Sequence, residues 1–187
     1  TTFPSLVSLL PAGGIAAAFH TPLAGVIFAM EVIVAEYTVV GFIPVMLAAV
    51  SASAVSLSLS GNEPLFALPA MRTASLGEIP MILLLGFCCG LAVAAFIRLI
   101  KVTGSVAHWP VMVRFTFAGC ITGALALGVP QILGIGYDSL QLVVQGEVAL
   151  SLLLLIAACK LVATATSSGL GLPVGLIGPN LLIGACL

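Results

Sequence analysis

A glycine- and proline-rich segment near the end of the chain carries the clearest chemistry. It reads GLGLPVGLIGPN over 169–180, and apolar sequence follows it. Proline suits the first turn of a helix and breaks a helix interior, so the segment predicts a helix that begins close to residue 175. A helix that begins within a membrane leaves about four N–H groups without partners and directs the positive end of its dipole at that point. Backbone groups alone then bind an anion, and no basic side chain is required.

The residues assigned to this predicted anion site are Gly175, Leu176, Ile177, Gly178 and Pro179. The N–H groups of Leu176 and Ile177 would face a ligand at the helix tip, and the two glycines would let the backbone approach that ligand closely. An alternative explains the same glycines by close packing between helices. The composition of the segment favours neither explanation over the other.

Three ionisable residues lie inside or at the end of apolar stretches. Glu31 ends a short apolar segment, and Glu36 follows five residues later. Each carboxylate either accepts bonds from neighbouring amides or faces water, and Glu31 has the further option of tuning an ion pathway. Lys160 lies within a long apolar run, where an ionised group is costly. Its side chain either extends to the membrane surface, pairs with an acid, or raises the positive potential near an anion path.

The composition excludes a water-soluble protein. Of 187 residues, 6% are charged and 61% are hydrophobic, and the mean hydropathy is +1.35, whereas soluble domains carry roughly 25% charged residues. So few charges cannot cover a globule in water, and a net charge of −1 offers no patch for nucleic acid. The five cysteines have the spacing of neither a metal site nor a disulfide framework. We therefore expect no metal, no cofactor and no catalytic residues.

Recurring charge-free runs predict an all-α polytopic membrane protein, because a bilayer core needs about 20 apolar residues in helical form. The predicted helices cover 4–18, 22–36, 40–60, 79–100, 111–130, 148–166 and 175–187. Residues 61–78 hold the longest polar linker, which marks a boundary between two halves. The basic residues of the 98–114 turn predict that this turn is cytoplasmic. Because the chain lacks an initial Met and stops within an apolar run, we expect it to be a fragment of a longer protein.

Two long motifs resemble those of the CLC family of chloride channels and chloride/proton antiporters. The stretch GIAAAFHTPLAGVIFAME over 14–31 is similar to the family pattern G-x-A-A-x-F-N/H-x-P-L-A-G-x-x-F-x-x-E. The stretch over 171–184 is similar to the pattern G-x-P-x-G-x-F-x-P-x-L-x-x-G, with Ile177 in the place of Phe. The motifs occur in the family's order, and the resemblance extends over essentially the whole chain.

The resemblance implies an all-helical inverted repeat with short broken helices and a complete pore in each subunit of a homodimer. Residues 1–62 would then be the end of the first membrane repeat, 63–78 an extramembrane linker, and 79–187 the larger part of the second repeat. The implied function is voltage- or ligand-modulated transport of chloride or a similar small anion. The expected location is a plasma membrane or a bacterial inner membrane, with the lipid bilayer as surroundings and no nucleic-acid partner.

The resemblance also assigns roles to individual residues. Backbone amides at the start of the second motif's helix bind the central anion, which here are those of Leu176 and Ile177. In the family's antiporters the residue after the glutamate of the first motif is a second acid that relays protons, whereas this chain has Glu31 followed by Val32. Valine cannot carry a proton, so we expect a channel-like pathway. A chloride/proton antiporter remains the alternative if Glu36 or another water route carries the proton.

Two functions of other classes are alternatives to anion transport. An intramembrane hydrolase would use Ser167 or Ser168 with His20 or His108, but nucleophilic catalysis needs an oriented base beside the nucleophile. No third orienting group is evident in the sequence, and the histidines are distant from the serines. A cation or neutral-solute transporter would need acids in the middle of the membrane, whereas the acids here lie at the predicted ends of spans.

Overall fold

A computed structural model describes residues 3–35, 39–61, 76–106, 108–146 and 148–187. Every regular element in these ranges is a helix. Internal contacts divide the chain into two units, Thr1–Phe66 and Ala67–Leu187, and each unit is described by itself. Among the described residues, four helices are long and apolar enough to cross a membrane: Val40–Ser60, Ile79–Gly104, Val111–Gly128 and Leu150–Gly169. They confirm the predicted all-α polytopic class and the predicted spans at 40–60, 79–100, 111–130 and 148–166.

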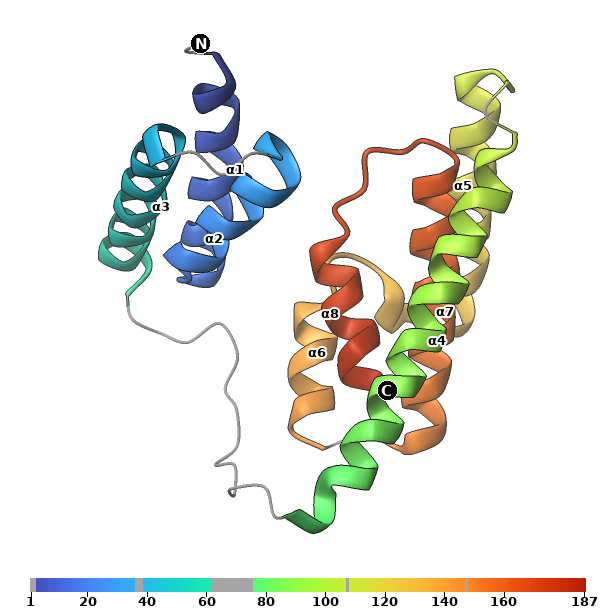
Figure 1. The fold of residues 1–187 in the computed structure, drawn as a ribbon. Helices are drawn as coiled ribbons and strands as arrows, with labels where there is room; N and C mark the ends of the chain where they lie inside the picture. Colours follow the sequence, from blue (N-terminus) through green and yellow to red (C-terminus); the bar gives the residue numbers. More distant parts are fainter. Residues whose placement is uncertain (1–2, 36–38, 62–75, 107, 147) are drawn as a thin grey trace. The chain divides into compact units, whose positions relative to one another are not determined.

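The first unit contains α1 (Phe3–Phe19), α2 (Pro22–Phe28), a π-helical segment η1 (Ala29–Val34) and α3 (Val39–Ser60). In this unit α1 packs against both α2 and α3, drawn in blue to teal in Figure 1. Its core consists mostly of small or medium-sized side chains: Ala12, Ala16, Val26, Ala29, Met30, Val45 and Ala49. Small side chains let helix backbones approach each other closely, which is how helices associate in lipid.

Gly25 shows how closely α2 lies on α1. A Cβ atom at Gly25 would overlap the carbonyl oxygen of Ala12 and would lie 3.2 Å from the amide nitrogen of Ala16. A side chain at this position would therefore push the two helix backbones apart. This glycine of the first motif has a packing reason that is independent of any ligand.

The break between α1 and α2 falls where the sequence predicts it. His20 adopts a left-handed φ of 53° just after α1, and Pro22 begins α2, where proline is favoured. Ser56 of α3 fastens this turn, because its Oγ donates to the carbonyl oxygen of Ala17 at 2.9 Å and lies 3.5 Å from His20 Nε2. The histidine thus takes part in a structural hydrogen-bonding cluster.

The helix predicted over 22–36 takes a mixed form. Its α-helical part ends at Phe28, and η1 continues with wider π-helical turns until Ala35 adopts a left-handed φ of 55°. Segments of π-helix are rare and often occur at functional sites. The apolar pattern of this stretch does not distinguish the two helix types. The predicted end of the helix at Glu36 lies outside the described residues.

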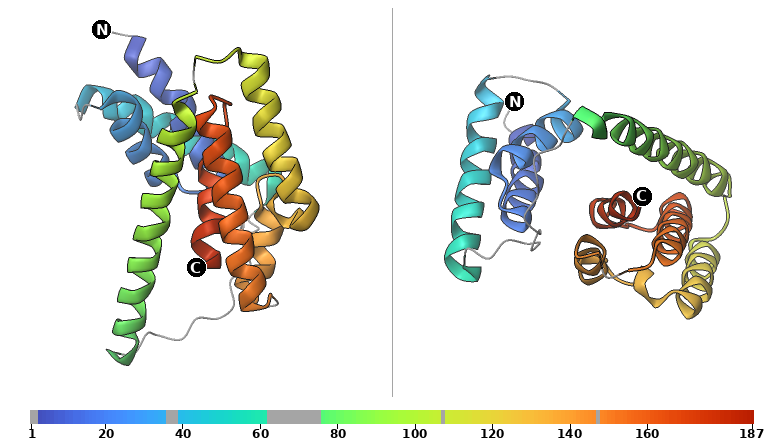
Figure 2. Two further views of the ribbon diagram at one scale, coloured as in Figure 1. Left: turned by 90° about the vertical axis from the view of Figure 1, so that its right-hand side faces the viewer. Right: turned by 90° about the horizontal axis from the view of Figure 1, so that it is seen from below.

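The second unit contains η2 (Leu76–Glu78), α4 (Ile79–Gly104), α5 (Val111–Gly128), η3 (Pro130–Ile132), α6 (Tyr137–Val144), α7 (Leu150–Gly169) and α8 (Ile177–Cys186). The right-hand view of Figure 2 shows α5, α6, α7 and α8 nearly end-on, with α4 oblique to them. In this unit α7 contacts α4, α5 and α8, and α8 also packs against α6. Eight residues of α7 are buried, whereas α4, which is described in full, buries none, so α7 is the central helix.

The predicted assignment of 1–62 and 79–187 to two membrane repeats stays a prediction. Of the predicted linker at 63–78, only η2 at its end belongs to the described residues. Along the chain, the division between the two compact units falls between residues 66 and 67, close to the predicted boundary. The division rests on the contacts within each unit, and it does not test whether the two units are repeats of each other.

Candidate anion-binding site

The candidate site is the beginning of α8. A non-helical segment separates α8 from the end of α7 at Gly169, and α8 begins at Ile177. Leu176 is the N-cap residue, and within the described part of the chain no side chain caps this helix and no acid occupies its first turn. The hydrogen bond from Asn180 N–H to Leu176 O, at 3.1 Å, lies one turn into the helix. The N–H groups of Ile177 and Gly178 therefore have no partner in the helix itself.

The two residues of the predicted site that flank the helix start are accessible. Leu176 is 37% exposed and Ile177 is 41% exposed. A Cβ atom at Gly175 would meet open space among the described residues. The helix start thus presents uncapped N–H groups and a dipole end beside an open position, which is the arrangement that favours an anion. Pro179 lacks an N–H and occupies the first turn, where none is needed.

Gly178 differs from Gly175. A Cβ atom at Gly178 would lie 2.5 Å from Ile135 Cγ2 and 3.1 Å from the Ile135 carbonyl oxygen. Ile135 precedes α6, so this glycine lets the α5–α6 connection pack onto α8. Packing between elements therefore accounts for Gly178, and open space beside the helix tip is found at Gly175. The chloride-binding role of both residues stays a prediction.

The segment before α8 is tied back to the end of α7. Leu172 N–H donates to Ser167 O at 3.0 Å, and Gly171 N–H donates to Ser168 O at 3.0 Å. Gly171 has a left-handed φ of 86°, which glycine adopts readily. A Cβ atom there would lie 3.1 Å from Nη1 of Arg114, so a guanidinium from α5 is next to this segment. The sequence did not single out Arg114 as a neighbour of the motif, because the two are far apart in the chain.

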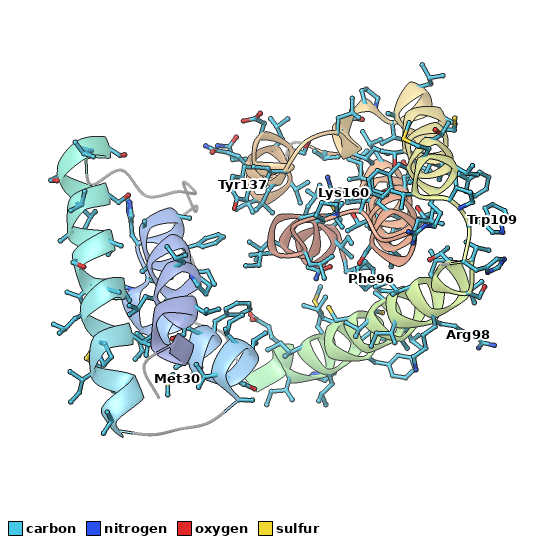
Figure 3. The ribbon with its side chains drawn as sticks, turned by 90° about the horizontal axis from the view of Figure 1, so that it is seen from above. Met30, Phe96, Arg98, Trp109, Tyr137 and Lys160 are labelled. Atoms are coloured by element: carbon cyan, nitrogen blue, oxygen red, sulfur yellow. The ribbon has the colours of Figure 1, made fainter. Side chains whose placement is uncertain are left out.

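Lys160 adopts an arrangement that the sequence did not predict. It is 3% exposed, and its Nζ donates to the carbonyl oxygens of Ile132 at 2.7 Å and Gly134 at 2.8 Å. Of the alternatives given for Lys160, extension to the membrane surface and pairing with an acid are not what the described residues show, because the ammonium is bound by backbone carbonyls. A contribution to the potential near an anion path stays a prediction. Figure 3 shows Lys160 within the group of α6, α7 and α8, whereas Arg98 and Trp109 lie at the periphery of the same unit.

Glu31 and Val32 of the first motif lie in η1, and both are exposed. They belong to the first unit, whereas the predicted chloride-binding residues belong to the second. Glu36 lies outside the described residues. The role of Glu31 and Val32 in proton transfer stays a prediction.

The serines proposed for hydrolysis have other neighbours in the second unit. Ser167 is buried, and its Oγ lies 3.5 Å from the hydroxyl of Thr122 on α5. His108 is exposed and packs edge-on against the indole of Trp109. Within the described part of this unit, no nucleophile and base are brought together by these residues.

The described residues thus combine four helices that are long and apolar enough to cross a membrane with an uncapped helix start beside a glycine–proline segment. Residues 5–187 match the family model described as voltage gated chloride channel. The chain therefore belongs to this family, the CLC family, and it is an integral membrane protein.

Several curated relatives resemble the chain along most of its length. The H(+)/Cl(-) exchange transporter ClcA of Vibrio parahaemolyticus is 31% identical over 189 residues, which cover 96% of this chain and 40% of the relative. The voltage-gated ClC-type chloride channel ClcB of Citrobacter koseri is 32% identical over 181 residues, which cover 92% and 42%. The chloride channel protein CLC-f of Arabidopsis thaliana is 32% identical over 193 residues, which cover 94% and 25%. The chain thus spans less than half the length of these relatives.

Proposed function

We propose that the protein to which this chain belongs transports chloride or a similar small anion across a membrane, and that the start of α8 contributes to the anion's binding site. The observation that supports this most directly is the uncapped helix start at Ile177, which lies in a motif of the CLC family. The relatives whose names state an activity are chloride channels or chloride/proton exchangers. The names of these relatives also favour transport over hydrolysis.

The physical basis is that backbone dipoles hold the anion without a full counter-charge. The N–H groups of Leu176 and Ile177, together with that of Gly178, replace part of the ion's hydration shell, and the α8 dipole adds to their attraction. A lysine or arginine at the same place would bind the anion more strongly and delay its release. Partial charges therefore suit a site that an ion must both enter and leave.

The channel-like mode is the form of transport that we favour. Val32 occupies the position at which the family's antiporters carry a second acid, and a valine side chain cannot exchange a proton. Exchange of chloride for protons is the second candidate, because relatives of both kinds are similar to this chain. Glu31, which is exposed in η1, is the nearest acid to this position among the described residues.

The test uses the full-length protein reconstituted into liposomes. With valinomycin present to balance charge, we expect chloride efflux that protein-free liposomes do not show. A chloride gradient should drive no stoichiometric proton uptake if the pathway is channel-like. Proton uptake in fixed proportion to chloride would contradict the channel-like mode, and the lack of chloride efflux would contradict anion transport altogether.

A further inference from the structure

We infer that Lys160 is a positioning residue for the anion site: its ammonium group holds the α5–α6 connection in the shape against which the first turn of α8 packs. This inference rests on the proposed function, because it assigns Lys160 to the site at the start of α8. It differs from a role in which the lysine attracts the anion directly through its charge.

The first step is the binding of the ammonium group. Lys160 is 3% exposed in the middle of α7, and it donates two hydrogen bonds to the carbonyl oxygens of Ile132 and Gly134, at 2.7 Å and 2.8 Å. A charged group in a membrane protein interior is expensive unless it is bound by polar partners. Hydrogen bonds to a charged donor are also stronger than neutral ones. The lysine therefore fixes these two carbonyl groups firmly.

The second step is the shape of the connection itself. Gly134 and Gly136 have left-handed φ values of 65° and 91°, a backbone conformation that glycine adopts readily. Ser139 Oγ donates to Gln131 O at 3.1 Å, which joins the beginning of the connection to α6. Lys160, on α7, donates to two carbonyl oxygens of the same connection. The connection is thus held from two helices at once.

The third step is the contact with α8. The backbone and the Cγ2 atom of Ile135 lie against the Cα atom of Gly178, the second residue of α8. One residue further, a Cβ atom at Gly136 would lie 2.8 Å from Cδ2 of Leu182, which is fully buried in α8. The segment that Lys160 holds therefore contacts α8 at its first and second turns. Movement of this segment would shift the N–H groups of Ile177 and Gly178.

The experiment measures chloride affinity in the full-length protein by calorimetry, and amide hydrogen exchange in segments 130–136 and 176–182. Lys160→Met removes the hydrogen bonds and the charge, and we expect it to weaken chloride binding about tenfold, as for the loss of one well-placed charged hydrogen bond. It should also accelerate exchange in both segments. Lys160→Arg, which keeps the charge and the donors, should recover most of the affinity. Lys101→Met removes an exposed lysine at the end of α4 and serves as the control.

A double-mutant cycle separates positioning from a direct effect of charge. Ile135→Ala changes no charge and truncates a side chain that is 60% exposed, so it should leave the protein folded. If Lys160 acts through the connection, the double variant Lys160→Met/Ile135→Ala should bind chloride about as weakly as Lys160→Met alone. Additive losses would overturn the inference in favour of a direct effect of charge.

The outcomes also distinguish this inference from the proposed function. If the unmodified protein neither binds nor transports chloride, the proposed function fails, but the exchange measurement still tests whether Lys160 holds α8. Unchanged exchange at 176–182 in folded Lys160→Met would overturn the inference even if chloride transport is intact. If Lys160→Met does not fold, the other two single variants supply the test. A loss of chloride affinity in Ile135→Ala together with unchanged affinity in Lys160→Arg supports the inference. Unchanged chloride affinity in both variants overturns it.

Discussion

The two short helices α2 and α8 begin in the same way and are used differently. Each comes after a longer helix, and neither has a side-chain cap among the described residues. In α2 proline is the first helical residue, so that position has no N–H. The space in which a side chain at Gly25 would lie is occupied by the backbone of α1. In α8 the first residue is Ile177, which keeps its N–H, and Gly175 borders open space. Similar glycine–proline patterns thus produce a packed joint in one unit and a candidate ion site in the other.

The largest expected effect of a single substitution lies in α2. Gly25→Ala should reduce stability by about 2–3 kcal/mol or prevent folding, because the added Cβ overlaps the Ala12 carbonyl and backbone cannot move as a side chain can. Thermal unfolding of the purified full-length protein in detergent measures this. Gly14→Ala is the control, since its Cβ meets nothing within 4 Å in the described part of α1. Equal melting temperatures for both variants would contradict the close approach of α1 and α2.

The two glycines around the start of α8, Gly175 before it and Gly178 within it, should differ in the same manner but less severely. Gly178→Ala should weaken chloride binding and lower stability by about 1–3 kcal/mol, because its Cβ collides with Ile135 and displaces the first turn. Gly175→Ala has room for its methyl group and should preserve stability to within about 0.5 kcal/mol. Calorimetric chloride titration together with thermal unfolding checks both variants. Greater instability in Gly175→Ala than in Gly178→Ala would show that packing has been assigned to the wrong glycine.

Local patterns predicted where both helices start, because proline and glycine affect the backbone conformation of the residues next to them. The starts at Pro22 and Ile177 follow from such residues. The partners of Lys160 were not predictable, because they lie 26 and 28 residues away and depend on how α7 meets the α5–α6 connection. Close packing was one of the two explanations that the sequence offered for Gly178, but its partner Ile135 was not predictable for the same reason. Gly134 and Gly136 are typical of a turn, but nothing in the sequence indicates which helix that turn packs against.

A smaller effect on stability is expected from a change in the first motif. Val32 is 59% exposed, so Val32→Glu should alter the free energy of unfolding by no more than about 0.5 kcal/mol. If the protein lacks proton exchange because it has no second acid at this position, the variant should show chloride-driven proton uptake above the level of the unmodified protein in liposomes. Ile33→Glu, at an exposed neighbouring position, is the matched control. Equal uptake in both variants would argue that position 32 has no special part in proton transfer.

The smallest effect is expected at the end of α7. Ser167→Ala removes a hydroxyl whose contact with Thr122 is long, at 3.5 Å, so chloride transport should be retained and stability should fall by no more than about 1 kcal/mol. Chloride efflux from liposomes and thermal unfolding measure the two quantities. Abolished transport with intact folding would place Ser167 in the ion pathway and extend the candidate site from α8 into α7.

The most direct measurement removes one backbone donor from each short helix. Replacing Ile177 by its α-hydroxy analogue turns the amide into an ester, and the same replacement at Leu23 serves as the control in α2. Neither N–H has a partner within its own helix, so both helices should persist. We expect chloride affinity to fall about tenfold for the ester at 177 and to stay unchanged for the ester at 23. Unchanged affinity at 177, or equal losses at both positions, would contradict the assignment of the anion site to the start of α8.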